Sequence, residues 1–229
     1  MKKFYFVIAA VAAMFIATEA YAQLGVGVGY NHGITTERVS GETETDGLDG
    51  FYVEATYDLN LMDRGWGSLA LQPGVRFSYM GESDRDEVLG VLVKESFNET
   101  YFDVPVLVKY SYELGTVKLN AFAGPVFSFG LTSVSKVSAD DYLFKYHNYT
   151  GKTVTKGESS SAINPDTHPE YGRFDLKLGL GVGATIMEKF NVKVGYNIGM
   201  LNRYTGEQVK DYRFTKHTGV FYVGLGFNF

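Results

Sequence analysis

The chain contains no cysteine, only five prolines among 229 residues, and no apolar run long enough to cross a membrane as a helix. Without cysteine, neither a disulfide framework nor thiol chemistry is available. The formal net charge of −5 argues against nucleic acid as a partner. The longest apolar run, residues 4–17, has roughly 14 residues, whereas a spanning helix needs about 20. The sequence therefore does not predict a helical membrane protein or a disulfide-stabilised domain.

The first 22 residues have the three parts of a secretory signal peptide. Lys2 and Lys3 give the positive start, residues 4–17 the apolar segment, and Ala20-Tyr21-Ala22 the small-x-small cleavage site. A membrane-anchoring helix is the alternative, and the short apolar run disfavours it. We expect cleavage between Ala22 and Gln23, so that residues 1–22 are the signal peptide and residues 23–229 form one domain.

Glycine and aromatic residues are abundant, with 27 glycines and 15% aromatic residues. Apolar and polar residues alternate with a period of two in eight segments, and no helical period competes there. These segments are residues 24–32, 50–60, 68–81, 98–112, 117–132, 172–186, 190–202 and 218–229. The alternation predicts an all-β fold: an eight-stranded antiparallel up-and-down transmembrane β-barrel, preceded by a cleaved signal peptide.

The connections between these segments alternate in length. Short ones lie at residues 61–67, 113–116 and 187–189, and long polar ones at residues 33–49, 82–97, 133–171 and 203–217. Short turns on one rim and long loops on the other are typical of outer-membrane barrels. An even strand number then puts both termini on the periplasmic side of a Gram-negative outer membrane. Residues 88–93 could instead extend a hairpin above the membrane.

Three features indicate that the apolar faces point outward to lipid. The interior of an eight-stranded barrel is only wide enough for side chains, and the large apolar set would overfill it. Glycines on the other face would leave room inside for long charged side chains. Aromatic residues also recur near both ends of the apolar faces, where girdles are expected at the two membrane interfaces.

The polar faces would then line the lumen, and their charges nearly balance. They are Glu54, Asp58, Asp103, Glu113 and Asp175 against Arg76, Lys109, Lys118, Arg173, Lys177 and Lys193. Buried charges must pair, because an unpaired one costs several kcal/mol. We interpret these residues as an internal salt-bridge network that plugs the barrel. A polar ion pathway is the alternative.

Several segments resemble the PorT-like outer-membrane β-barrel family, whose members are often labelled porin family proteins. Residues 101–110 read YFDVPVLVKY and resemble its "Y-[LF]-[ED]-[IV]-P-[LV]-L-[LV]-K-Y" strand. AFAGP at residues 121–125, FDL with GLGVG in residues 174–183, and GYNIGMLN at residues 195–202 are similar to later strands, with Gly195 in place of the family's arginine. The resemblance covers nearly all of the mature chain and implies a barrel rather than a reaction.

The C-terminal Phe229 ends an apolar series with Leu225 and Phe227. This ending is similar to the signal that the barrel-assembly machinery reads, so we expect that machinery as a partner during insertion, together with outer-membrane lipid. It is equally consistent with an ordinary last lipid-facing residue, and both interpretations can hold together.

The sequence gives little support for a catalytic site or a metal site. His32 and His217 could meet at the rim where the first and last strands adjoin, but no serine and carboxylate stand at a telling spacing. Residues 133–171 form the longest stretch predicted to lack structure, and we expect a tyrosine-rich contact surface there rather than a metal site. No motif predicts a cofactor or a metal.

The sequence therefore predicts a small, non-enzymatic integral outer-membrane barrel with a largely plugged polar lumen. Its long extracellular loops would serve surface contacts or envelope integrity, and residues 133–171 would offer a site for an extracellular partner. A small porin-like pore, a lipid-modifying enzyme and a component of a protein secretion or assembly system are the alternatives, because fold alone does not decide function.

Overall fold

The computed structural model describes residues 22–39, 42–65, 67–88, 91–139, 142–156, 171–205 and 214–229. In these parts the chain forms ten strands: β1 (Ala22–Val39), β2 (Glu42–Arg64), β3 (Gly67–Val88), β4 (Val91–Leu114), β5 (Val117–Ala139), β6 (Tyr142–His147), β7 (Lys152–Lys156), β8 (Phe174–Ile186), β9 (Phe190–Gly199) and β10 (Phe214–Asn228). Within the same residues, no helix is long and apolar enough to cross a membrane. Most of the predicted signal peptide, residues 1–21, lies outside the described residues, so that prediction stays untested.

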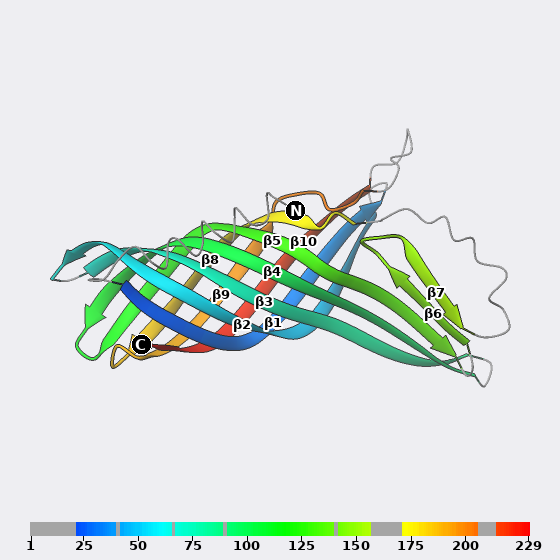
Figure 1. The fold of residues 1–229 in the computed structure, drawn as a ribbon, viewed down its shortest axis with the longest axis horizontal. Coiled ribbons are helices and arrows are strands. Elements are labelled where there is room, and N and C mark those ends of the chain that lie inside the picture. The colour runs from blue at the N-terminus through cyan, green and yellow to red at the C-terminus, as the bar shows by residue number, and fades with distance from the viewer. Residues whose placement is uncertain are drawn as a thin grey trace.

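Eight of these strands close into an antiparallel barrel. Each strand from β1 to β5 pairs with the next, β5 pairs with β8, and β8, β9 and β10 follow in order until β10 pairs with β1. Each of the eight predicted segments corresponds to one of these barrel strands, although the segments at residues 172–186, 190–202 and 218–229 were predicted one to three residues too long at one end. The predicted eight-stranded up-and-down barrel is confirmed. The short strands β6 and β7 are added beyond it, as a hairpin that continues the sheet from the far end of β5 (Figure 1).

The period-two pattern sorts the side chains as predicted, with the apolar face outward. Val28, Leu225 and Phe229 are 59%, 62% and 72% exposed. The neighbouring positions on the same strands carry glycines and polar residues, and they face the interior. Closure pairs the barrel strands on both sides, so the barrel wall leaves no unpaired edge at the depth of the apolar face.

Tight turns join the strands at one end of the barrel, which we call the turn end. Gly115, in the turn between β4 and β5, has a φ of +66°, a conformation that glycine adopts without a Cβ clash. The turn between β8 and β9 instead uses Met187 and Glu188, with φ of +52° and +62°. The C-terminus lies at this same end in Figure 1.

At the other end, which we call the long-hairpin end, the strands run much further than the sequence predicted. The segments predicted as loops at residues 33–49 and 82–97 are mostly paired strand, as far as Val39 opposite Glu42 and Val88 opposite Val91. The hairpin extension considered for residues 88–93 is therefore present, because β3 continues to Val88 and β4 begins at Val91. Apart from the apolar run at residues 88–93, these segments are mostly polar, and no regular apolar alternation marks them in the sequence.

The prediction that residues 133–171 lack structure is wrong for their first half. Residues 133–139 continue β5, and β6 and β7 follow. Cross-strand pairing is enough to order this polar segment, because the end of β5 offers its backbone to β6. Residues 157–170 lie outside the described residues.

Candidate functional site

The candidate site is the interior of the barrel together with its opening at the long-hairpin end. Of the charged residues predicted to line the lumen, six are buried inside the wall: Glu54, Arg76, Asp103, Lys109, Asp175 and Lys177. The side chains of Asp58 and Lys193 are partly buried there. Glu113, Lys118 and Arg173 lie at the two rims instead, and Glu113 and Arg173 are exposed.

A group of five residues crosses the middle of the barrel, and we call it the mid-barrel cluster: Tyr52, Glu54, Arg76, Lys193 and Tyr222. Glu54 and Arg76 are direct partners across β2 and β3, and Arg76 Nη2 lies 2.8 Å from Glu54 Oε2. Lys193 Nζ pairs with the other carboxylate oxygen of Glu54. The Arg76 guanidinium lies between two rings, 4.4 Å from the centroid of Tyr52 and 4.2 Å from that of Tyr222.

Glycines on neighbouring strands make this arrangement possible. A Cβ on Gly29 would overlap the Tyr52 ring and the carbonyl oxygen of Val223, and one on Gly195 would overlap the Tyr222 hydroxyl. Some inward glycines make room for charged side chains as predicted, such as Gly27 beside Glu54, and others make room for these tyrosine rings. Those rings pack with Leu107, Phe122 and Val126 in one buried apolar cluster.

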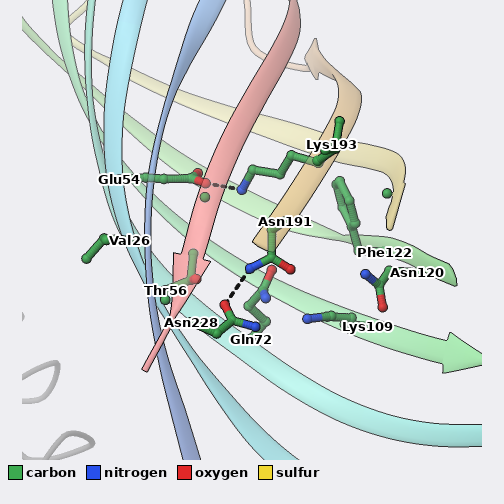
Figure 2. A pocket seen from close by; sticks show the side chains of 14 residues that line it. Val26, Glu54, Thr56, Gln72, Lys109, Asn120, Phe122, Asn191, Lys193 and Asn228 are labelled. Carbon is green, nitrogen blue, oxygen red and sulfur yellow. Dashed lines mark hydrogen bonds and ion pairs between the residues drawn. The ribbon is translucent and has the colours of Figure 1, made fainter. Parts of the chain in front are cut away.

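Below the mid-barrel cluster, toward the turn end, the interior is polar. Lys109 Nζ lies 2.6 Å from Asp58 Oδ2, and Gln72 donates to the other Asp58 oxygen at 2.6 Å. A chain of side-chain hydrogen bonds continues through Ser111, Asn120, Thr185, Asn191 and Asn228. The cavity among these groups has a volume of about 40 Å³ (Figure 2), which is room for a few water molecules.

Above the mid-barrel cluster, two more of the predicted lumen carboxylates accept hydrogen bonds, Asp103 from a neighbouring strand and Asp175 from the connection after β9. Asp103 accepts a hydrogen bond from Ser128 Oγ. Asp175 Oδ1 accepts one from the backbone N–H of Leu201 at 3.3 Å, while its Oδ2 has no partner among the described residues. Lys177 Nζ lies 4.7 Å from the centroid of the Tyr101 ring. The layers between the middle and the opening are therefore also occupied by side chains.

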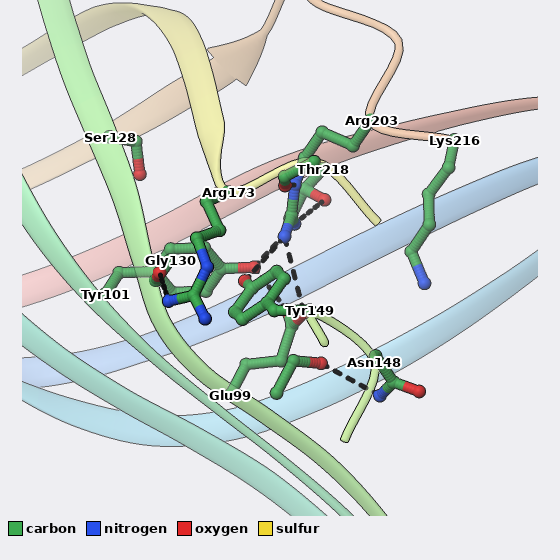
Figure 3. A network of polar contacts seen from close by, with 12 residues as sticks. Glu99, Tyr101, Ser128, Gly130, Asn148, Tyr149, Arg173, Arg203, Lys216 and Thr218 are labelled. Atoms are coloured by element: carbon green, nitrogen blue, oxygen red, sulfur yellow. Dashed lines mark hydrogen bonds and ion pairs between the residues drawn. The ribbon is translucent and has the colours of Figure 1, made fainter. Parts of the chain in front are cut away.

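A second buried group closes around Arg203 near the long-hairpin end, and we call it the mouth cluster: Glu99, Tyr101, Tyr149, Arg203 and Thr218. The guanidinium donates to the hydroxyl groups of Tyr101, Tyr149 and Thr218 at 2.5, 2.8 and 3.2 Å (Figure 3). It also lies 3.5 Å from Glu99 Oε1, and both side chains of this ion pair are completely buried.

The mouth cluster joins segments that are far apart in the sequence. Tyr149 belongs to the turn between β6 and β7, which is also held by Asn148 donating to Ser133 Oγ at 2.9 Å. Arg203 follows β9. Burial raises the pKa of Tyr149 to about 12. Burial alone would raise the pKa of Glu99 too, but Arg203 and the Tyr101 hydroxyl hold it below its ordinary value.

The rim charges make local contacts. Lys118 Nζ lies 2.8 Å from Glu113 and 3.4 Å from Glu188 at the turn end. Arg173 donates to the backbone carbonyls of Gly130 and Leu131 at 3.3 and 3.2 Å at the other end. These three predicted lumen residues therefore tie turns and loops to the wall rather than lining the interior.

The two histidines considered for catalysis do not meet. His217 lies opposite Thr36 and His32 opposite Phe221, four positions apart along the pairing of β1 with β10. His32 Nδ1 instead lies 2.7 Å from Asp49 Oδ1, on the exposed face. Among the described residues no serine or threonine hydroxyl bonds to His32, and no group of three or more acidic or histidine side chains could hold a metal ion.

Sequence reasoning missed the mouth cluster, and only part of it carried a signal. Glu99 lies within the predicted strand segment 98–112 and continues the inward series of Asp103 and Tyr101 by one more step of two residues, so the alternation itself carried this signal. Arg203 and Tyr149 lie in connections where no period applies. Their positions depend on the path that the β6–β7 turn and the connection after β9 take over the barrel opening.

The comparison with known families agrees with the barrel. A family profile described as "Outer membrane protein beta-barrel domain" matches residues 12–204. A search of the curated proteins finds no match. Among solved structures, the chain is similar to Ail of Yersinia pestis, crystallised with the heparin analogue sucrose octasulfate, at 14% identity and a TM-score of 0.39, covering 91% of this chain and 99% of Ail.

Two further solved structures show the same level of similarity. Neisserial surface protein A has 10% identity and a TM-score of 0.38, with 89% of this chain and 97% of that protein covered. The outer membrane protease OmpT of Escherichia coli has 11% identity and a TM-score of 0.38, with 93% and 98% covered.

Proposed function

This chain belongs to the outer membrane protein beta-barrel domain family, and we propose that it is a non-enzymatic barrel, closed to solutes, whose projecting strands make contacts outside the cell. The family places it in the outer membrane of a Gram-negative bacterium. Longer connections of such barrels face the exterior. We therefore assign the long-hairpin end to the extracellular side and both termini, with the predicted Ala22–Gln23 cleavage site, to the periplasm.

Strand length is the observation that carries this proposal. The strands β2 to β5 have 22 to 24 residues each, whereas about 9–11 residues of a tilted strand cross the membrane. About half of each strand is therefore available outside the bilayer. A paired sheet of this size, extended further by β6 and β7, gives a rigid surface for a partner, including the predicted contact region at residues 133–171.

The closed lumen is supported by the mid-barrel cluster. An interior of eight strands is only wide enough for side chains, and here Arg76, two tyrosine rings and the apolar cluster occupy its middle. Each charge in that cluster has a partner of opposite sign. A small pore is the alternative. A role in secretion or assembly rests on the PorT-like resemblance of residues 101–110.

Single-cysteine variants test the assignment of the two ends, because the chain has no cysteine of its own. Leu92, near the tip of β4, is 58% exposed, and Met187, in a short turn, is 67% exposed. On intact cells, a membrane-impermeant maleimide should label Leu92→Cys and should label Met187→Cys only after permeabilisation. The reverse pattern would contradict the proposal.

A shortened hairpin tests the surface function itself. Ser83 and Ser96 lie directly opposite each other on β3 and β4, so residues 84–95 can be replaced by an Asn-Gly turn that keeps the register. We expect a heat-modifiable, folded barrel. A photo-crosslinker at Val134, which remains in this variant, should lose the extracellular protein adducts that it forms in the full-length chain. Equal adducts in both chains would count against this surface.

A further inference from the structure

The barrel wall splits at the long-hairpin end. Pairing between β2 and β3 ends at Asp49 opposite Gly81. Beyond this point β2 stays paired with β1 and β3 with β4, and the two hairpins diverge in Figure 1. Among the described residues, no strand pairs with the facing edges at residues 42–48 of β2 and 82–88 of β3. Two strand edges therefore face a gap above the mouth cluster.

The gap contains a groove, which we call the mouth groove, made of two adjoining cavities of about 160 and 240 Å³. The cavities share Glu82, Phe97 and Ser135, so they form one elongated space. Its carboxylates outnumber its amino groups: they are Glu37, Asp46, Glu82, Asp84 and Glu95, against Lys136 and Lys216. Lys216 is already engaged, because its Nζ lies 2.7 Å from Glu37.

Two carboxylates and one buried hydroxyl group of this groove have no ion-pair or hydrogen-bond partner among the described residues. Asp84 and Glu95 lie directly opposite each other on β3 and β4. Like charges in that position destabilise a sheet, and neither residue has an ion pair with a described residue. Thr35, 4% exposed, lines the same groove, and its hydroxyl has no hydrogen-bond partner among the described residues. A buried polar group without a partner costs free energy, and a bound donor would remove that cost.

We propose that the mouth groove binds an extended, basic peptide segment of a partner protein. Lysine or arginine side chains would neutralise Asp84 and Glu95, and Phe97 would contact their aliphatic stems. The peptide backbone would pair with the strand edge of β3, as added strands do in other proteins. The length of the groove and the strand edges beside it fit a chain better than a single metal ion. The inference rests on the proposed function, since it names the partner of that surface.

Binding of a defined probe tests the inference. The full chain is placed in nanodiscs of neutral phosphatidylcholine, and a fluorescein-labelled peptide of eight alternating lysine and valine residues is titrated by anisotropy. We expect saturable binding that the matching glutamate–valine peptide does not show. The variant Asp84→Asn/Glu95→Gln should bind about tenfold more weakly, because two carboxylates are lost. The control Glu113→Gln/Glu188→Gln removes the same charge from the turn end and should leave binding unchanged.

Three outcomes would overturn the inference: no saturable binding, equal weakening in both double variants, or saturation of the groove by calcium chloride alone with no peptide binding. A peptide with alternate N-methylated residues cannot add to a strand edge, so its undiminished binding would also count against the pairing. Conductance is measured on the same protein preparation after transfer to planar bilayers. A barrel that does not conduct and does not bind the peptide refutes only peptide binding in the mouth groove. A barrel that conducts and binds the peptide refutes only the closed lumen.

Discussion

Replacing Arg203 with methionine should destabilise the barrel more than any other single charge deletion at the long-hairpin end. Arg203 is 1% exposed, and its guanidinium contacts three hydroxyl groups and Glu99. Methionine keeps much of the side-chain volume but makes none of these polar contacts. The substitution leaves Glu99 completely buried, with hydroxyl donors around it and with Lys216 as the remaining cation that acts on it.

The size of the expected loss in stability follows from the buried charge of Glu99, which loses its ion-pair partner. Breaking a buried ion pair by removing one partner costs about 3–5 kcal/mol, because the remaining charge is uncompensated. Arg173→Met is the matched control, since Arg173 is exposed and, among the described residues, has no ion pair: it donates to backbone carbonyls at 3.2 and 3.3 Å and lies 5.1 Å from the centroid of the Tyr149 ring. We expect this control to cost about 1 kcal/mol or less. The double variant Glu99→Gln/Arg203→Met should recover part of the loss.

Urea unfolding from lipid vesicles, followed by circular dichroism, measures these differences as free energies of unfolding. Limited proteolysis at residues 147–151 reports separately whether the turn that carries Tyr149 has been released. If Arg203→Met cost no more than Arg173→Met, the mouth cluster would not hold the long-hairpin end together. The same conclusion would follow if the double variant were as unstable as the sum of its single variants.

Two further predictions concern pH and packing. Because the pKa of Glu99 is held below its ordinary value by Arg203 and Tyr101, its contribution to stability is complete above the unfolded pKa of about 4.3 and is lost as the pH falls through the folded value. Urea unfolding between pH 6 and pH 3 should therefore show a steeper loss for the wild type than for Glu99→Gln, and parallel curves would contradict this. Gly29→Ala should cost about 1–3 kcal/mol, because its Cβ meets the Val223 carbonyl and the Tyr52 ring, which have no room to move. Gly172→Ala, whose Cβ finds its nearest atom at 3.5 Å, should be neutral in the same assay.

The sequence predicted the barrel because lipid imposes a strict rule on its outer face. Each strand that crosses the membrane must present apolar side chains at every second position, so Val26 and Val28 in β1 or Phe221 and Val223 in β10 reveal their strands directly. The same rule sorted Glu54 and Arg76 to the interior. Their pairing across β2 and β3 follows from the register, which alternation alone does not supply.

The parts that were missed lie where that rule no longer applies. Outside the bilayer, both faces of a strand can be polar, so the far ends of β1, β2, β3 and β5 look like loops in the sequence. Arg203 reaches the lumen from a connection, and its position depends on the fold of the whole chain.

Single-channel recording in planar bilayers tests the central claim, that this barrel is closed through its middle, most directly. For the wild type we predict no steady conductance, because Arg76 is held between Tyr52 and Tyr222 and is paired with Glu54. Tyr52→Ala/Tyr222→Ala, which removes both rings, should conduct if it remains heat-modifiable. A steady wild-type current that changes in Arg76→Ala would contradict the closed lumen and would identify the interior as an ion pathway.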